Sequence, residues 1–304
     1  MRRFDSPDVM LVTANVLWAL NYASTKFAME AWQPLAYSQL RFSAAAVLSC
    51  SIVLARERSL RIDRGDVAVV AAAAATGIFL NQVLFNYAVQ KTTAANVALI
   101  LASAPAFTAL FVVRVGQERL HLGHWLGLAV ALAGVALVVG GGGGVAGGSL
   151  LGNLLAVGAA VTWAAYSVML RPLFGRYSAF RLSALMIAIG AIMLLPLSLP
   201  QVHGQDYAAI GAGRWAAWGY STIFPLLVTN LLYFRSLRRV GAARATLYMY
   251  LQPFLAVLFA AVLLGEEVAL IQLAGGLIVI AGVALGRRGP RPRGGVEVQP
   301  ADAG

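Results

Sequence analysis

The stretch AANVALILASAPAFTALFVVRVGQERLHLGHWLGLAVALAGVAL at residues 94–137 recurs in diverged form at residues 242–285. The two copies align without a gap, and 14 of their 44 positions are identical, including Pro105 with Pro253 and Glu118 with Glu266. Both copies end in AGVAL. Self-similarity of this length indicates an internal duplication. Upstream matches, such as Asn81 with Asn230, extend the duplication over nearly the whole chain.

The composition indicates that lipid is the solvent for most of this chain. Of its 304 residues, 60% are hydrophobic and only 12% are charged, with a mean hydropathy of +0.77. Soluble domains carry about 25% charged residues. The sequence therefore predicts an all-α polytopic membrane protein. Ten stretches have the length of transmembrane helices: 9–29, 34–55, 67–89, 93–113, 120–140, 150–171, 179–199, 215–235, 243–264 and 268–286.

The basic residues predict the orientation of these spans. With the N-terminus in the cytoplasm, 19 of the 23 Lys and Arg residues fall on the cytoplasmic side and three on the other side. This asymmetry follows the positive-inside rule. The net charge of +11 is then a topology signal, and no nucleic-acid partner is expected. We expect a multi-pass protein of a bacterial inner membrane with both termini in the cytoplasm.

The domain organisation follows from the number of spans in each half. Five spans are an odd number, so the second half must enter the membrane in the opposite orientation. Inverted repeats of this kind are typical of secondary transporters, which bind substrate between the halves. We expect a first repeat at 1–139, a Gly-rich linker at 140–148, a second, inverted repeat at 149–286 and a disordered cytoplasmic tail at 287–304.

Several stretches carry a resemblance to a known family. LWALNYASTKFA (17–28), QLRFSAAAVL (39–48), PFLAVLFAAVLLGEEV (253–268) and the closing AGVAL resemble the EamA-type transporters of the drug/metabolite transporter superfamily. The resemblance covers about residues 10–286 and occurs in both halves. It implies a basket-like exporter of ten helices around a central cavity. The aromatic amino acid exporters are candidates for near relatives, although no motif specifies the substrate.

Charged side chains within the membrane are functional candidates because they are costly to bury. Every acid and histidine falls in a loop, a tail or a helix end, which leaves no evident proton relay. Either transport is coupled to an ion gradient through other groups, or the protein is a facilitator that carries its substrate down the substrate's own gradient. We favour the facilitator. Lys26 is expected to snorkel to the outer interface, and Glu118 and Glu266 to cap the helix that follows each. Arg41, about two turns inside the second span, either binds a substrate carboxylate or reaches back to the headgroups.

Polar and aromatic side chains on shared helix faces define a candidate substrate cavity. Trp18, Asn21 and Tyr22 have i, i+3 and i+4 spacing and therefore share one face. Amides that faced lipid would leave hydrogen bonds unmet, so these faces should point inward. The alternative for each amide is a hydrogen bond between helices. The candidate cavity residues are Trp18, Asn21, Tyr22, Arg41, Asn81, Phe85, Trp163, Tyr166, Asn230, Tyr248, Tyr250 and Gln252.

Other residues are expected to shape or anchor the helices. Pro105 and Pro253 are expected mid-helix at equivalent positions, as hinges or as static bends. The tryptophans near span ends are typical of an interfacial belt: Trp32, Trp125, Trp215 and Trp218. Glycines in the fifth and tenth spans permit close packing, within the chain or at a dimer contact. We expect a monomer or a weak homodimer surrounded by membrane lipid.

Together these features predict a secondary transporter that exports a small metabolite by alternating access. An aromatic or otherwise amphipathic amino acid suits a cavity lined by amides and aromatic rings. The alternative is a sugar, phosphorylated-metabolite or drug transporter of the same superfamily, although phosphates would require more buried Arg or Lys. The sequence predicts no enzyme activity, no catalytic residue, no metal and no cofactor.

Overall fold

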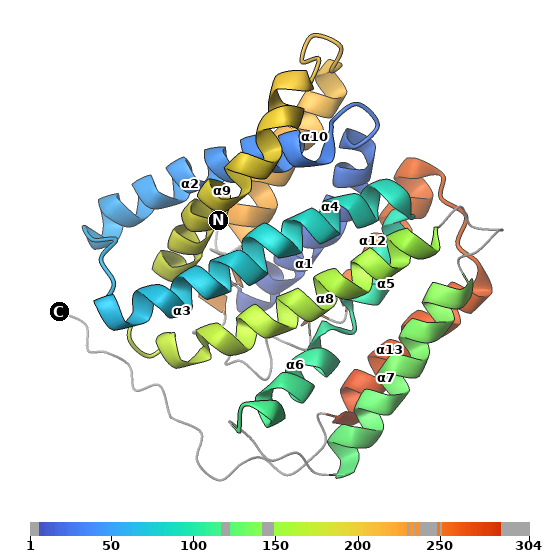
Figure 1. Cartoon of the computed structure of the whole chain (residues 1–304). Helices are drawn as coiled ribbons and strands as arrows, with labels where there is room; N and C mark the ends of the chain where they lie inside the picture. The colour runs from blue at the N-terminus through green and yellow to red at the C-terminus, as the bar shows by residue number, and fades with distance from the viewer. Residues whose placement is uncertain are drawn as a thin grey trace.

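The computed structural model describes residues 6–116, 122–141, 149–229, 232–233, 235–236, 248–249 and 251–286, and all regular elements within these ranges are helical. The expected linker and tail lie largely or wholly outside these residues. The first repeat contains α1 (Pro7–Ala28), α2 (Pro34–Glu57), α3 (Arg64–Ala74), η2 (Ala75–Leu80), α4 (Asn81–Lys91), α5 (Ala94–Leu101), α6 (Ala104–Arg114) and α7 (Leu122–Gly141) (Figure 1). The second contains α8 (Leu150–Leu170), η3 (Arg171–Leu173), α9 (Ala179–Gly204), α10 (Ala212–Ile223), η4 (Phe224–Val228), α12 (Leu251–Leu264) and α13 (Leu270–Gly286).

The helices confirm a polytopic membrane protein. Five stretches are long and apolar enough to cross a membrane: Pro34–Glu57, Arg64–Lys91, Ala94–Phe111, Leu150–Leu173 and Ala179–Gly204. Shorter apolar helices cover Trp125–Val138, Leu251–Leu264 and Leu270–Leu285. The 22-residue helix α1 is not among these five stretches, and it carries polar side chains of the candidate cavity. It begins with Pro7 in its first turn, where the missing N–H of proline costs no helical hydrogen bond.

Helix contacts relate the two repeats by a pseudo-two-fold axis. The second helices, α2 and α9, pack on each other, and so do the last helices, α7 and α13 (Figure 1). Several other contacts between the repeats occur in exchanged pairs. α4 packs on α8 as α10 packs on α1, and α8 packs on α5 and α6 as α12 packs on α1. With an odd number of spans in each repeat, such exchange is what an inverted repeat produces.

Glycines bring α7 and α13 into backbone contact. A Cβ added at Gly134 would lie 2.6 Å from the Gly275 carbonyl oxygen, and one added at Gly282 would lie 2.4 Å from the Ala131 nitrogen. Only glycine permits this approach, because any side chain would push the helices apart. These glycines therefore serve packing within the chain.

A π-helical turn interrupts the third span of each repeat. η2 joins α3 to α4, and η4 follows α10 at the equivalent position. Each contacts the first helix of the other repeat. Gly77 of η2 lies against the ring of Tyr166 on α8, and the Pro225 carbonyl of η4 accepts a hydrogen bond from Trp18 Nε1 at 3.3 Å. Single π-helical turns are frequent at functional sites.

Pro105 and Pro253, which align between the two repeats, lie within the first three residues of α6 and α12 as the structure describes them. α5 ends at Leu101 and α6 begins at Ala104, so Pro105 is in the first turn of a new helix. Pro253 is the third residue of α12. The expected mid-helix position is wrong for Pro105, because the chain ends one helix before it and begins another, and a proline in a first turn displaces no helical hydrogen bond. A hinge role for both residues stays a prediction.

Candidate functional site

The predicted face of α1 meets three other segments. Tyr22 is buried, with its ring 6.0 Å from the Phe85 ring in an edge-to-face arrangement, and its hydroxyl accepts a hydrogen bond from Gln252 Nε2 at 3.3 Å. The Trp18 ring lies 5.6 Å from the Tyr233 ring. The structure thus brings Trp18, Tyr22, Phe85 and Gln252 together from both repeats.

Arg41 is enclosed by protein. Its side chain lies on α2 with 3% of its surface exposed, and its guanidinium carbon is 5.9 Å from the centre of the Tyr37 ring. Arg41 Nε donates a hydrogen bond to the Ser221 carbonyl of α10 at 2.8 Å. No carboxylate among the described residues pairs with it. Of the two expectations, the reach to the headgroups is wrong, because the guanidinium bonds inward to α10.

The asparagines of α4 bond to two different helices, Asn81 to α8 and Asn86 to α2. Asn81 Nδ2 donates to the Ala159 carbonyl at 2.7 Å and to Thr162 Oγ1 at 3.0 Å, which ties α4 to α8. These bonds are the interhelical alternative. One turn further, Asn86 Nδ2 donates to Ser38 Oγ at 2.5 Å and to the Gln82 carbonyl at 2.7 Å, while its buried amide oxygen has no partner among the described residues.

The remaining predicted cavity residues lie apart from this group or outside the described residues. Trp163 and Tyr166 pack perpendicular to each other on α8, with ring centres 5.2 Å apart, and Trp163 is 43% exposed. The Tyr248 hydroxyl donates to Asp8 Oδ1 at 2.7 Å, in the first turn of α1. Asn230 and Tyr250 lie outside the part of the chain that the structure describes.

A pair of opposite charges holds the short turn between α4 and α5. Lys26 Nζ donates to the carbonyls of Val89 at 2.8 Å and Thr92 at 2.6 Å, which ties the end of α1 to the end of α4. Its reach to the outer interface stays a prediction. Glu266 accepts from the backbone N–H of Ala94 at 2.8 Å and of Ala95 at 3.1 Å. Glu266 therefore caps α5, not the helix that follows it, because the chain fold brings that N-terminus to it.

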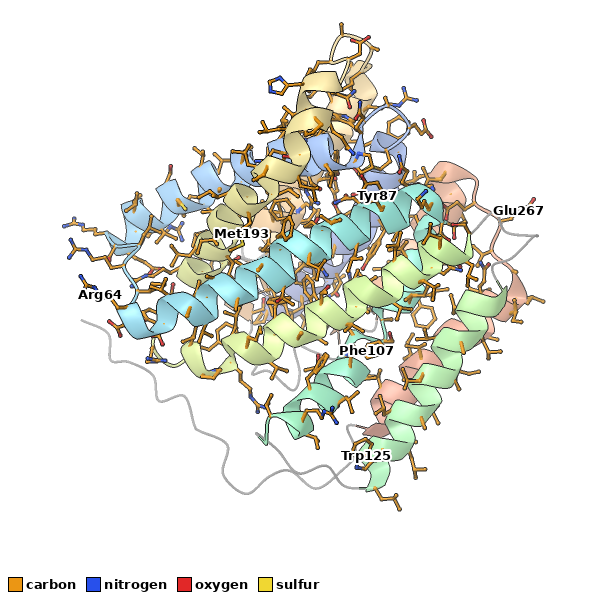
Figure 2. The ribbon with its side chains drawn as sticks, viewed as in Figure 1. Arg64, Tyr87, Phe107, Trp125, Met193 and Glu267 are labelled. Carbon is orange, nitrogen blue, oxygen red and sulfur yellow. The ribbon has the colours of Figure 1, made fainter. Side chains whose placement is uncertain are left out.

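An aromatic cluster lies at the same end of the molecule. Trp32 is only 2% exposed, and its ring lies 4.8 Å from that of Trp215 and 6.2 Å from that of Trp218, which is nearly parallel to it. The interfacial expectation is wrong for Trp32, since the indole packs against other rings and is shielded from lipid. Trp125, by contrast, is 43% exposed near the start of α7 (Figure 2).

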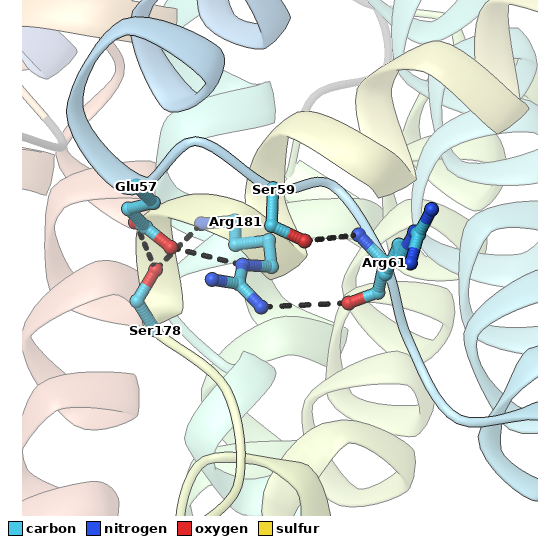
Figure 3. Close-up of polar contacts among 5 residues, drawn as sticks. All are labelled: Glu57, Ser59, Arg61, Ser178 and Arg181. Atoms are coloured by element: carbon cyan, nitrogen blue, oxygen red, sulfur yellow. Dashed lines mark hydrogen bonds and ion pairs between the residues drawn. The ribbon is translucent and has the colours of Figure 1, made fainter.

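The opposite end carries ion pairs between the repeats. Glu57, at the end of α2, accepts from Ser178 Oγ at 2.5 Å and from Arg181 Nε at 2.9 Å, both at the start of α9 (Figure 3). Asp66 of α3 accepts from Arg176 at 2.7 Å. Arg64 and Tyr87 lie toward opposite ends of the span formed by α3, η2 and α4 (Figure 2), so the charged clusters mark its two ends.

Comparison with known proteins identifies the family. The model of the EamA-like transporter family matches residues 6–140 and, a second time, residues 150–286. The chain belongs to the EamA-like transporter family. Membership confirms the resemblance seen in the sequence and makes the protein a multi-pass membrane transporter with a small-molecule substrate.

Individual relatives of this EamA-like transporter span nearly its whole length. It is 29% identical over 279 residues to a protein of Streptantibioticus cattleyicolor named "Probable terminal-alkyne amino-acid exporter", covering 90% of this chain and 91% of that one. It is 28% identical over 277 residues to the Escherichia coli inner membrane transporter YedA, covering 88% and 86%. A solved crystal structure with 21% identity superposes with a TM-score of 0.63 over 93% of this chain and 97% of the other, which shows the shared fold.

Several residues of this region escape prediction from the sequence. Ser38, Tyr37 and Ser221 surround Arg41 or Asn86, yet serines and tyrosines in apolar spans carry no individual signal. Asn86 shares helical spacing with Gln82, but only the contact with Ser38 places it beside α2. The π-helical turns have no recognisable sequence pattern either. Once η2 is known, however, the internal duplication predicts η4 at the equivalent position of the second repeat.

Proposed function

We propose that this EamA-like transporter exports an amino acid with an aromatic or otherwise amphipathic side chain across a bacterial inner membrane. The observation that carries the proposal is Arg41. A guanidinium buried to 3% exposure without a carboxylate partner among the described residues is costly. A substrate carboxylate would supply the missing charge through two parallel hydrogen bonds.

The surroundings of Arg41 favour an amphipathic substrate. The rings of Tyr37 and Phe42 lie 5.9 and 5.5 Å from its guanidinium carbon, and Tyr22 and Phe85 form an edge-to-face pair on neighbouring helices. Aromatic rings with a few polar groups suit a small molecule that has one charged end and one apolar end. The naming of one relative as an amino-acid exporter supports the same class.

Alternating access is the mechanism we propose, with both termini in the cytoplasm. The pseudo-two-fold relation between the repeats allows them to exchange conformations and so to expose one site to either side. In that mechanism the Lys26 and Glu266 contacts would close one end, and the Glu57–Arg181 pair would close the other. The two π-helical turns, each against the first helix of the other repeat, are candidates for the segments that move.

The test is export of radiolabelled L-phenylalanine from proteoliposomes loaded with it. We expect flux above that of empty liposomes, and a loss of at least about tenfold in Arg41→Met, since the substrate carboxylate would lose a charged partner. Arg41→Lys should retain part of the flux, because it keeps the charge without the paired geometry.

The matched control is Arg214→Met. Arg214 also lies over an aromatic ring, 5.2 Å from the centre of Phe27, but it is partly exposed and is paired with Glu30 at 2.6 Å. This variant should export at the wild-type rate. Wild-type flux in a folded Arg41→Met would contradict the proposal, and flux of a sugar phosphate without any flux of amino acids would replace it.

A further inference from the structure

A proline removes the helical donor of one backbone carbonyl in α10. In an α-helix the carbonyl of each residue accepts a hydrogen bond from the N–H four residues later. For Ser221, in the last turn of α10, that residue is Pro225, which has no N–H. Pro225 is buried in η4, the π-helical turn that follows α10 directly. The Ser221 carbonyl is therefore open to a donor from another helix.

That donor is Arg41 of α2. Its Nε lies 2.8 Å from the Ser221 carbonyl oxygen, and the bond is buried. Freed carbonyls in membrane helices can be satisfied by a hydroxyl, by water or by a local change of helix geometry, all without burying a charge. A guanidinium costs more in this place, because its charge is removed from water. Its presence indicates that the charge also serves a second partner.

The bond to Ser221 engages one nitrogen of the guanidinium and leaves the other two. Neither Nη of Arg41 has a partner in the part of the chain that the structure describes, and neither is wholly enclosed by it. Because the guanidinium is planar, a fixed Nε–H also fixes the plane and the direction of the two Nη atoms. These two atoms form the fork that can hold a carboxylate through parallel hydrogen bonds.

We infer that Pro225 is a positioning residue for substrate binding. By removing one N–H, it opens the Ser221 carbonyl to Arg41 Nε, and this bond orients the Nη pair for the substrate carboxylate. Any other residue at position 225 would supply the helical N–H, which would compete with Arg41 for the carbonyl. The guanidinium would then be less well oriented before binding, and affinity for a carboxylate would fall. The inference rests on the proposed function and deepens it, because it adds the residue that orients the cation.

The experiment measures competition against bound radiolabelled L-phenylalanine on the purified full-length protein. The competitors are unlabelled L-phenylalanine and L-phenylalaninamide, in which a neutral amide replaces the carboxylate. In the wild type the amide should compete at least about tenfold more weakly, since hydrogen bonds between two charged groups are lost. In Pro225→Ala this ratio should fall to about threefold or less, because binding of the carboxylate weakens and binding of the amide does not. A purely structural role of Pro225 would weaken both competitors equally and leave the ratio unchanged.

Two further variants make the result interpretable. Pro225→Val also restores an N–H but leaves no cavity at this buried position, so it guards against a folding defect in Pro225→Ala. It should lower the ratio as well. The matched control is Pro196→Ala. Pro196 lies inside α9, in another span, and no described side chain donates to the Ile192 carbonyl four residues before it. The control should keep the wild-type ratio.

The outcomes separate the two proposals. An unchanged ratio in both variants at position 225, or loss of the folded protein in both, overturns the positioning role while phenylalanine export still supports the proposed function. A lowered ratio in Pro196→Ala as well overturns it too, because the effect would then not be local. Equal competition by phenylalaninamide in the wild type, or a lack of both binding and export of phenylalanine, overturns the proposed function and the positioning role with it.

Discussion

The contact between Gly77 and Tyr166 predicts a strong effect of one added methyl group. A Cβ at Gly77 would lie 2.3 Å from Tyr166 Cγ, 2.6 Å from Cδ1 and 2.7 Å from Cβ. All three distances are well below van der Waals contact, and the obstructing atoms are the base of a ring that packs against α3 and η2. The ring base follows the backbone of α8, so Gly77→Ala must displace the π-helical turn from α8.

The expected magnitude follows from two opposing effects. Overpacking a filled interior costs about 1–3 kcal/mol, and the contacts of 2.3–2.7 Å put Gly77→Ala in the upper part of that range, at about 2–3 kcal/mol. Alanine regains about 1 kcal/mol over glycine in a helix. The net loss of unfolding free energy is therefore about 1–2 kcal/mol, and at about 2–4 °C per kcal/mol the Tm falls by roughly 2–8 °C.

The assay uses the lone cysteine of the chain. Cys50 is partly buried, so a thiol-reactive fluorescent dye reports its exposure as the protein unfolds on heating in detergent. The matched control is Gly158→Ala, at the same interface on α8. Its Cβ would lie 3.2 Å from Leu84 Cδ1, the end of a flexible side chain that can rotate away. This variant should stay within about 0.5 kcal/mol of the wild type.

A double variant tests the cause. Tyr166→Ala removes Cγ and Cδ1, the two atoms closest to the new methyl group, so Gly77→Ala should lower the Tm less in that background than in the wild type. Equal Tm values for Gly77→Ala and the wild type would refute the reasoning. So would an equal decrease in both backgrounds, because the clash would then not involve the ring.

Two further predictions concern the charged contacts at the two ends. Lys26→Met should destabilise the protein by about 1.5–3 kcal/mol, because the carbonyls of Val89 and Thr92 lose a charged donor. The same change at the exposed Lys91 is the control, and equal Tm values for the two variants would contradict the prediction. Arg181→Gln should cost less than about 1 kcal/mol, since this ion pair with Glu57 is partly exposed, with 20% and 23% of the side chains accessible. Its difference from the wild type should shrink as salt is added, and a salt-independent loss of more than about 2 kcal/mol would show a buried interaction instead.

Much of the fold was predictable because lipid imposes a simple rule. A helical chain in the bilayer must form its backbone hydrogen bonds within its own helices. Apolar stretches of sufficient length therefore predict transmembrane helices. The expected span at 34–55 is α2, at Pro34–Glu57, and that at 150–171 is α8, at Leu150–Leu170. The helix break at Pro105 was not predictable, since proline is compatible with a kink as well as with a new helix start.

The candidate site was predictable only in outline. Helical spacing placed Trp18 and Tyr22 on one face, and the structure joins that face to Phe85 and Gln252. Spacing within a helix says nothing of which faces of different helices meet. For that reason Tyr248 was grouped with the site, although its hydroxyl bonds to Asp8.

The sequence by itself determined that this protein lies in the membrane, that it is duplicated and to which family it belongs. Composition, charge asymmetry and repetition are properties of the chain that survive without coordinates. Only the tertiary structure decided the partners of each polar group. It joined Lys26 to the end of α4, enclosed Trp32 among other rings, and bound Arg41 to the Ser221 carbonyl of α10. Such partnerships depend on the register and rotation of packed helices, which neighbouring helices impose on one another.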